Sequence, residues 1–231
     1  MLSKNLVLFI LSGFAVAATA AAQPFTAHAV SKANACDWLQ EVKRTNTWFE
    51  RDQNARKAVQ LLREKKRTDP TVTEQQLSAA WDSVVKNDRV LQSELDDLVG
   101  RCGWPTTSGY GDKAPQYAAF IVQHAELPYQ EKYLPMMQAA ADAKELAPRH
   151  VAMLVDRILM HKKLPQRYGT QLVSEGGKLV VYRLENPREL DKRRAAVAMV
   201  PASFCAYLAM FEPTPQSALC NTPTRPKSAG Q

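Results

Sequence analysis

Apolar residues recur at helical spacing along two long stretches of the chain. In residues 37–67, and again in residues 77–99, they form the stripe that is typical of one buried helix face. The segment 69–71 (Asp-Pro-Thr) interrupts this pattern, and Thr73 followed by Gln76 has the form of a capping box. The pattern therefore predicts two long helices that are joined by a short turn and pack antiparallel.

Shorter helical stretches follow the hairpin. Residues 103–111 are rich in Gly, Ser and Thr and predict a loop. After this loop we expect helices at about 115–126, at about 128–144 and from Pro148 onward, each with a proline in its first turn. The last of them contains the almost wholly apolar run 151–160, so it should be buried on most sides.

The hydrophobic period changes in the last third of the chain. Residues 168–173 and 179–182 have the composition of strands, and Glu-Gly-Gly at 175–177 predicts a turn between them. The Asn-Pro-Arg-Glu of residues 186–189 has the form of a further helix start. The expected fold is therefore mainly α, an antiparallel helical hairpin plus a helical bundle with one small β-hairpin at 168–182.

The N-terminal segment differs from the rest of the chain. Lys4 precedes an apolar segment at 6–18, and small residues follow, as in a secretory signal peptide. We expect a signal peptide at residues 1–22, with Ala27-His28-Ala29 as the second choice of cleavage site. The alternative, a membrane anchor, needs ~20 apolar residues and a cationic flank, which this segment lacks. The mature protein is expected to be exported, either periplasmic or secreted, and to span no membrane.

The remaining chain divides into three parts. Residues 23–72 hold the N-terminal helix of the hairpin, and residues 73–211 form the expected helical core domain. Residues 212–231 are rich in Pro, Ser and Thr, and this composition predicts a disordered tail.

All four cysteines lie beyond the expected signal peptide. An even number in an oxidising compartment indicates two disulfides. Of the three connectivities we favour Cys36–Cys102, which would tie the ends of the hairpin, and Cys205–Cys220, which would hold the tail. Free buried thiols are the alternative. There is no Cys-x-x-Cys pair and no histidine close to the cysteines, so their spacing indicates no metal site.

The net charge of +7 leaves the class of partner open. Basic residues gather at 63–67, 161–163 and 192–194, which would favour anionic envelope polymers or acidic proteins. Acidic residues interleave them, so solvated helix faces are the alternative. The sequence has no nucleic-acid-binding signature. It also lacks the motifs of serine hydrolases, zinc proteases, P-loop proteins and dinucleotide-binding proteins, and we expect no cofactor.

Asp156 and Arg157 interrupt the apolar run of the fifth expected helix. Charges on a buried helix are costly unless other groups pair with them or donate hydrogen bonds. One interpretation is an internal salt bridge that fixes the helix packing. The other is the floor of a catalytic site, with Asp156 as a base or an orienting group and Arg157 as an anion clamp.

Two further polar residues fall on apolar helix faces. His124 lies one turn after aromatic residues of the third expected helix, either as a core histidine or as a catalytic one. Asp88 falls on the apolar stripe of the second long helix, where Arg51 or Arg56 of the first helix would form a structural ion pair with it.

The segment 166–171 is a candidate ligand-binding segment. It carries two amides, a phenol and a guanidinium, and its candidate residues are Gln166, Tyr168, Gly169 and Gln171. Gly169 would permit a positive φ or a close approach by a ligand. The alternative is a polar turn. Trp104, in the preceding Gly-Trp-Pro loop, is either a lid over the core or an aromatic platform for a sugar ring.

Five short motifs together resemble a known bacterial family. They are Gly103-Trp104-Pro105, Val122-Gln123-His124, Asp156-Arg157, the Gln-x-Tyr-Gly-Thr-Gln of residues 166–171 and Asp191-x-x-Arg194. The family is an uncharacterised one, catalogued as domain of unknown function 6624, and the resemblance covers about residues 81–200. It implies no activity. It implies only that these residues occur together.

Three functional hypotheses follow. The first is a periplasmic ligand-binding or interaction module whose polar cluster holds a small anionic or amide-bearing molecule. The second is a hydrolase-like enzyme with His124 as general base, Asp156 orienting it, and Arg157 with Gln171 stabilising negative charge. The third is a structural envelope protein. In the first two cases at least four of six side chains should lie within one pocket of roughly 10 Å that is partly open to solvent, and the six are His124, Asp156, Arg157, Gln166, Tyr168 and Gln171.

Overall fold

The computed structural model describes residues 36–176, 178–211, 214–215 and 217–220. The expected signal peptide lies outside the described residues, and so does most of the expected tail. In the part that is described, the fold is mainly helical with one two-stranded antiparallel sheet, which confirms the predicted fold class.

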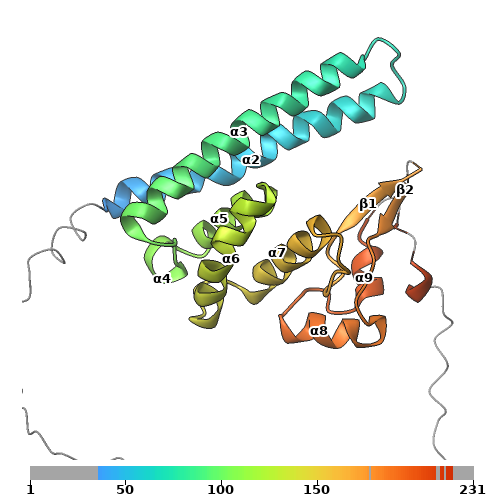
Figure 1. The fold of residues 1–231 in the computed structure, drawn as a ribbon. Helices are drawn as coiled ribbons and strands as arrows, with labels where there is room; N and C mark the ends of the chain where they lie inside the picture. Colours follow the sequence, from blue (N-terminus) through green and yellow to red (C-terminus); the bar gives the residue numbers. More distant parts are fainter. Residues whose placement is uncertain (1–35, 177, 212–213, 216, 221–231) are drawn as a thin grey trace, which may run out of the picture.

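The two long helices form the predicted hairpin and run side by side across one side of the molecule (Figure 1). Helix α2 spans Trp38–Lys66 and α3 spans Glu74–Cys102. Asp37 caps α2 by accepting a hydrogen bond from the backbone of Gln40. The capping box that begins at Thr73 is present at the start of α3. Both helices begin at the expected positions because these side chains satisfy backbone N–H groups of the first turn.

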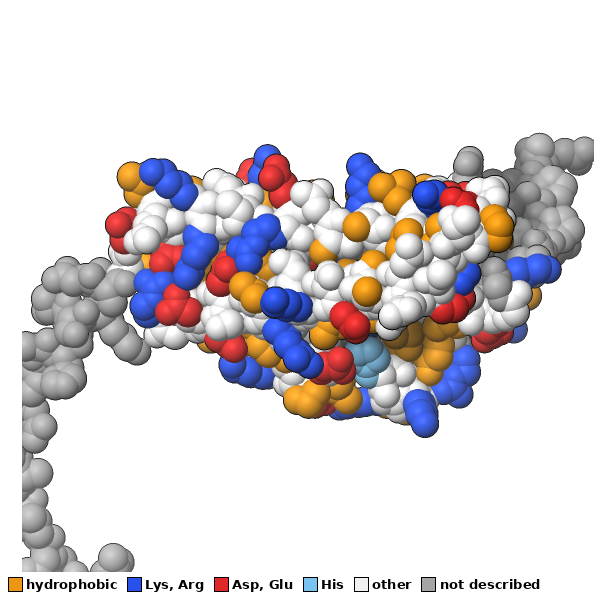
Figure 2. All heavy atoms as spheres, turned by 90° about the horizontal axis from the view of Figure 1, so that it is seen from above, with side chains coloured by type: hydrophobic (Ala, Val, Ile, Leu, Met, Phe, Trp, Pro, Cys, Tyr) orange, Lys and Arg blue, Asp and Glu red, His pale blue; other side chains and the backbone are white. Residues whose placement is uncertain are grey.

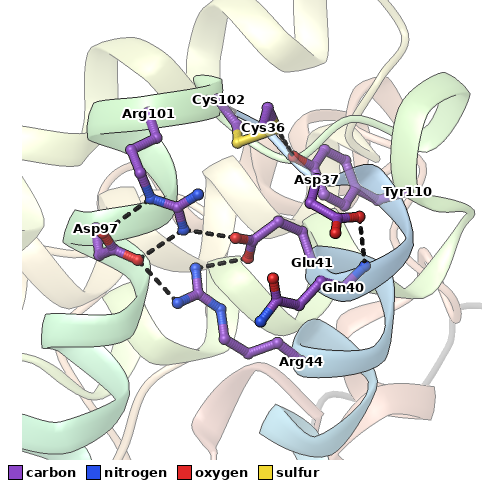
Figure 3. Close-up of a disulfide and its surroundings, with 9 residues drawn as sticks. All are labelled: Cys36, Asp37, Gln40, Glu41, Arg44, Asp97, Arg101, Cys102 and Tyr110. Carbon is purple, nitrogen blue, oxygen red and sulfur yellow. Dashed lines mark hydrogen bonds and ion pairs between the residues drawn. A yellow bond between two sulfur atoms is a disulfide. The ribbon is translucent and has the colours of Figure 1, made fainter. Parts of the chain in front are cut away.

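A disulfide and a ring of ion pairs hold the open end of the hairpin together (Figure 3). Cys36 is bonded to Cys102 as predicted, with Cα atoms 5.5 Å apart. The ring consists of Glu41 and Arg44 from α2 and of Asp97 and Arg101 from α3, with each arginine bridging both acids. Glu41 is only 3% exposed, so its charge would be costly to bury without these two cations.

Shorter helices lie beneath the hairpin (Figure 1). They are α4 (Thr107–Tyr110), α5 (Lys113–His124), α6 (Leu127–Asp142) and α7 (Pro148–His161). Helix α5 is central, because it packs against α2, α3, α6 and α7. The single turn of α4 forms where the sequence predicts only a loop, and the Thr106 hydroxyl caps it by accepting from the Gly109 amide.

The main core lies between the hairpin and α5. Trp48 of α2 and Leu95 of α3 meet Val122 of α5, and all three are fully buried. Trp104 belongs to the same cluster, with its ring 6.0 Å from that of Tyr133. Trp104 is 9% exposed with its ring against that of Tyr133, which favours the lid over the core rather than the platform for a sugar ring.

A smaller C-terminal lobe follows α7. It contains β1 (Leu172–Glu175), β2 (Lys178–Val181), η1 (Pro187–Glu189), α8 (Leu190–Ala196), α9 (Phe204–Leu208) and η2 (Ala218–Cys220). Leu190, Phe204 and Leu208 form its own small core. The predicted disulfide between Cys205 and Cys220 attaches the η2 segment to α9.

The first strand begins later than the sequence predicts. The expected strand covers residues 168–173, whereas β1 begins at Leu172. Leu172 is paired with Val181 of β2. The backbone N–H groups of Tyr168 and Thr170 instead donate to the carboxylate of Asp156. They are not available to a sheet, which is why this prediction was wrong.

The basic segments are neutralised locally. Lys66 pairs with Glu74, and Lys162 pairs with Glu131. Figure 2 shows basic and acidic side chains interleaved over the outer face of the hairpin. None of the helices in the described part is long and apolar enough to cross a bilayer, and no group of three His, Cys, Asp or Glu residues there is placed to hold a metal ion.

Candidate functional site

Asp156 of α7 is enclosed by the loop that precedes β1. Its carboxylate is 0% exposed. It accepts hydrogen bonds from the backbone N–H of Arg167 (2.7 Å), Tyr168 (3.0 Å) and Thr170 (3.0 Å), and from the Thr170 hydroxyl (2.9 Å). Burial raises the pKa of Asp156, and these hydrogen bonds oppose that rise. The partner of the buried charge is therefore backbone, neither an internal salt bridge nor a histidine.

Gln166 and Gln171 complete this loop. Gln166 is 0% exposed. Its side chain donates to the backbone carbonyls of Gln171 (3.0 Å) and Tyr182 (2.8 Å), and it accepts from the backbone N–H of Gln171 (2.8 Å). The Gln171 side chain donates to the Thr170 hydroxyl. Both amide side chains thus form hydrogen bonds within the protein, which favours the polar-turn interpretation of this segment over the ligand-binding one.

Gly169 is required by packing and by backbone conformation. Its φ is +69°, and a Cβ at this position would lie 2.7 Å from the ring of Phe204. Tyr168 is partly buried, with the guanidinium of Arg167 5.9 Å from its ring centre. Neither residue lines the cleft described below.

The Asp-x-x-Arg motif joins α8 to the same loop. Arg194 is 1% exposed and donates to the carbonyls of Tyr168 (2.8 Å), Ala202 (2.9 Å) and Pro201 (2.9 Å). Asp191 accepts from the backbone N–H of Phe204 at the start of α9. These motif residues hold the C-terminal lobe on α7, so their role is structural.

His124 and Arg157 line a separate cavity, which we call the hairpin cleft. Its volume is about 330 Å³, and it is lined by residues of α2, α3, α5 and α7 and of the turn after α5. The lining residues are Arg56, Trp81, Val85, Asp88, Arg89, Gln92, Gln123, His124, Ala125, Glu126, Arg157 and His161. The six residues expected to share one pocket are therefore divided. Two line the hairpin cleft and four belong to the Asp156 loop or its immediate contacts.

His124 is oriented by Asp52, not by Asp156. Its Nδ1 lies 2.9 Å from Oδ1 of Asp52, which is 2% exposed. Arg56 Nε lies 3.1 Å from the same Nδ1 and 3.2 Å from Asp52 Oδ1. A guanidinium only donates, so Nδ1 accepts from Arg56 when the imidazole proton is on Nε2, and donates to Asp52 when the proton is on Nδ1. Nε2 has no hydrogen-bond partner among the described residues, and its lone pair is free in the second tautomer.

The cations of α2 divide between two acids of α3. Arg56 binds Asp88 through both carboxylate oxygens, at 2.8 and 2.9 Å, and Arg51 binds Glu94. Of the two expected partners of Asp88, Arg56 is the correct one. Burial raises the pKa of Asp88. Burial also acts to raise the pKa of Asp52, but the hydrogen bond and charge of His124, together with the charge of Arg56, outweigh it and lower that pKa.

Arg157 has no partner of its own. In the part of the chain that the structure describes, its guanidinium forms no ion pair and no hydrogen bond, and its Nε is buried without an acceptor. Burial and the nearby charge of Arg56 lower the pKa of Arg157. Gln123, 6% exposed, lines the same cleft, and its Oε1 is buried without a donor. Unpaired buried polar groups of this kind are rare in folded proteins and mark a site that an outside group can complete.

Asp52 is the site residue that sequence reasoning missed. It lies four residues after Trp48 and seven before Val59, so it falls on the buried face of α2. The same reasoning that singles out Asp88 on α3 would have found it.

The fold and the site define a small helical domain in which a disulfide-clamped hairpin covers a polar cleft. The chain belongs to the family described as a family of unknown function (DUF6624), which it matches over residues 52–214. The match begins at Asp52 and contains every lining residue of the hairpin cleft. No curated protein and no solved structure matches the chain.

Proposed function

We propose that this protein is an exported binding protein that holds a small anionic ligand in the hairpin cleft. The observation that carries the proposal is the unpaired guanidinium of Arg157, whose buried Nε has no acceptor. Arg157 is partly buried, so its charge is only partly hydrated, and an anion bound at this point would compensate it. An arginine binds carboxylate or phosphate through two parallel hydrogen bonds, which suits a side chain fixed on a rigid helix.

The neighbouring charges support an anion at this place. Asp52 and Asp88 both bind Arg56, so neither acid is paired with Arg157. Arg89 and Glu126 also line the cleft, and neither forms an ion pair in the described part of the chain. The unpaired charges of the cleft are therefore two arginines and one glutamate, and the two arginines are the groups that an anion would bind.

Replacement of Arg157 tests the proposal. Binding of small organic acids and of inorganic phosphate to the purified protein would be measured by calorimetry and by thermal shift. Arg157→Gln should weaken binding at least tenfold, which is about 1.4 kcal/mol or more, because it removes the charged donor pair. Arg149→Gln is the matched control, because Arg149 is an exposed arginine on the same helix that does not line the cleft. An equal loss in both variants, or no binding by the wild-type protein, would contradict the proposal.

Export is the second part of the proposal. The signal-peptide pattern of residues 1–22 supports it, and so do the two disulfides, which persist in oxidising compartments. We expect the intact mass of protein from the cell envelope or the medium to correspond to a chain that starts at Gln23. Protein that retains Met1 would refute the expected cleavage.

A hydrolase-like activity is the second candidate, and the Asp52–His124 pair favours it. In the tautomer in which Nδ1–H donates to Asp52, Nε2 is able to accept a proton, as in a general base. No serine, threonine or cysteine lines the cleft in the described part, so the attacking group would be a water molecule. If the protein turns over a bound ester, His124→Gln should abolish turnover and leave binding within a few fold. Turnover that survives this change would rule the mechanism out.

A further inference from the structure

Trp81 gives the hairpin cleft an exposed aromatic wall. Its side chain is 46% exposed, on α3, and it lines the same cleft as Arg157. Val85, one turn further along α3, continues the apolar wall. The guanidinium of Arg63 lies over the indole of Trp81, 5.9 Å from its centre. A large aromatic surface beside charged groups is typical of a site where a flat face of a ligand is covered.

Gln123 defines a second requirement on the ligand. Its side chain is 6% exposed and lines the cleft, and it makes no hydrogen bond with any described residue. Its Oε1 is buried, so a ligand hydroxyl in the cleft would accept a hydrogen bond from its Nε2, which is not among the buried atoms. The side chains of Arg157 and Gln123 therefore require different functional groups on the ligand. Arg157 needs an anion, and Gln123 needs a hydroxyl.

We infer that the ligand of the hairpin cleft is an acidic sugar, a single hydroxylated ring that carries an anionic group. This inference rests on the proposed anion site and adds the ring and its hydroxyls. The anionic group binds Arg157, a hydroxyl binds Gln123, and the ring lies against Trp81. The cavity of about 330 Å³ lies at the small end of the ~300–1,000 Å³ range of ligand pockets, which suits one ring.

Four probes separate the parts of this inference. Calorimetry on the purified protein would compare D-glucuronate with D-glucose, acetate and benzoate. Glucose has the ring and hydroxyls without the charge, acetate has the charge alone, and benzoate has the charge and a flat ring without hydroxyls. We expect glucuronate to bind at least tenfold more tightly than each of the other three.

Two variants assign the contacts. Trp81→Ala should weaken glucuronate binding about tenfold and leave the weak binding of acetate unchanged. Trp38→Ala is the control, because Trp38 is 49% exposed and does not line the cleft. Gln123→Leu should reduce the preference for glucuronate over benzoate and leave benzoate binding intact. Circular dichroism would establish that all three variants keep their helix content.

The outcomes separate this inference from the proposed function. If acetate binds as tightly as glucuronate and Arg157→Gln abolishes both, the anion site stands and the sugar ring is refuted. If benzoate equals glucuronate, the hydroxyl contact is refuted. If glucose binds as tightly as glucuronate, the anionic group is not what the cleft selects. If none of the four binds, the acidic-sugar inference fails, and binding of phosphate would then decide the proposed function by itself.

Discussion

Asp156 and Arg157 are adjacent in the chain and have opposite surroundings. Asp156 accepts hydrogen bonds from four donors in the loop before β1, three backbone N–H groups and one hydroxyl, and these donors stabilise its charge. Arg157, one position later, points to another side of α7 and lines the hairpin cleft without a partner. Adjacent positions on a helix are about 100° apart around its axis, so one pair can serve a structural loop and a binding site separately.

Asp156→Asn should destabilise the protein. The amide replaces one acceptor oxygen with a donor that faces backbone N–H groups, which leaves buried donors unpaired. We expect a loss of about 3 kcal/mol in the free energy of unfolding, measured by chemical denaturation. Asp82→Asn, an exposed position on α3, should change it by less than about 0.5 kcal/mol. A loss of ligand binding without a loss of stability would instead place Asp156 in a binding site.

His150 should make the stability of the protein depend on pH. It is 6% exposed and lies edge-on to Phe120, and burial, followed by the charge of Arg149, lowers the pKa of His150 to about 4. The unfolded chain binds this proton near pH 6.5, whereas the folded protein does not until about pH 4. The contribution of His150 to stability is therefore complete above pH 6.5 and is lost progressively as the pH falls to about 4.

The measurement compares unfolding free energies at pH 7 and pH 5. The wild-type protein should lose about 1–2 kcal/mol more than His150→Leu, which cannot titrate. An equal pH dependence in the two proteins would show that His150 is protonated in the folded state.

At the scale of elements, the sequence predicted those parts of the fold that depend on local signals. The hairpin follows from its apolar stripes and from the caps at Asp37 and Thr73. The strand prediction was wrong at residues 168–171, because the backbone N–H groups of Tyr168 and Thr170 donate to the carboxylate of Asp156 on α7. Helix α9 was also missed, since its first N–H is held by Asp191 from α8. Neither contact is visible in local sequence.

The two disulfides should differ in their effect on stability. Cys36 and Cys102 are 66 residues apart, and Cys205 and Cys220 are 15 apart. The entropy that a cross-link removes from the unfolded chain grows with the length of the loop it closes. Replacing both cysteines of the first bridge with alanine should cost about 4 kcal/mol, and the same change at the second about 3 kcal/mol. Denaturation of the two double variants would measure this, and a larger cost at the second bridge would contradict the loop-length account.

At the scale of the whole molecule, the site could be predicted only in part. His124 and Arg157 were found because a polar residue on an apolar face is visible in the sequence. Their grouping with Asp156 was wrong, since it assumed that neighbours on a buried helix face the same partners. Asp52 and Trp81 come from the two helices of the hairpin, and only the packing of the hairpin on α5 brings Asp52 to His124 and Trp81 to the cleft.

Because both helices of the hairpin contribute to the cleft, the protein cannot be shortened at the hairpin turn without changing the cleft. The turn of the hairpin, near residue 72, is an obvious boundary for a truncated protein, because α2 precedes it and the rest of the domain follows it. A fragment of residues 73–211 would keep Arg157 and Trp81 but would lose Asp52 and Arg56, and it would expose the apolar face of α3 that α2 covers. Truncation at this turn would therefore remove the group that orients His124 together with the packing that supports it. The smallest unit in which the hairpin cleft is complete is therefore one that still includes α2.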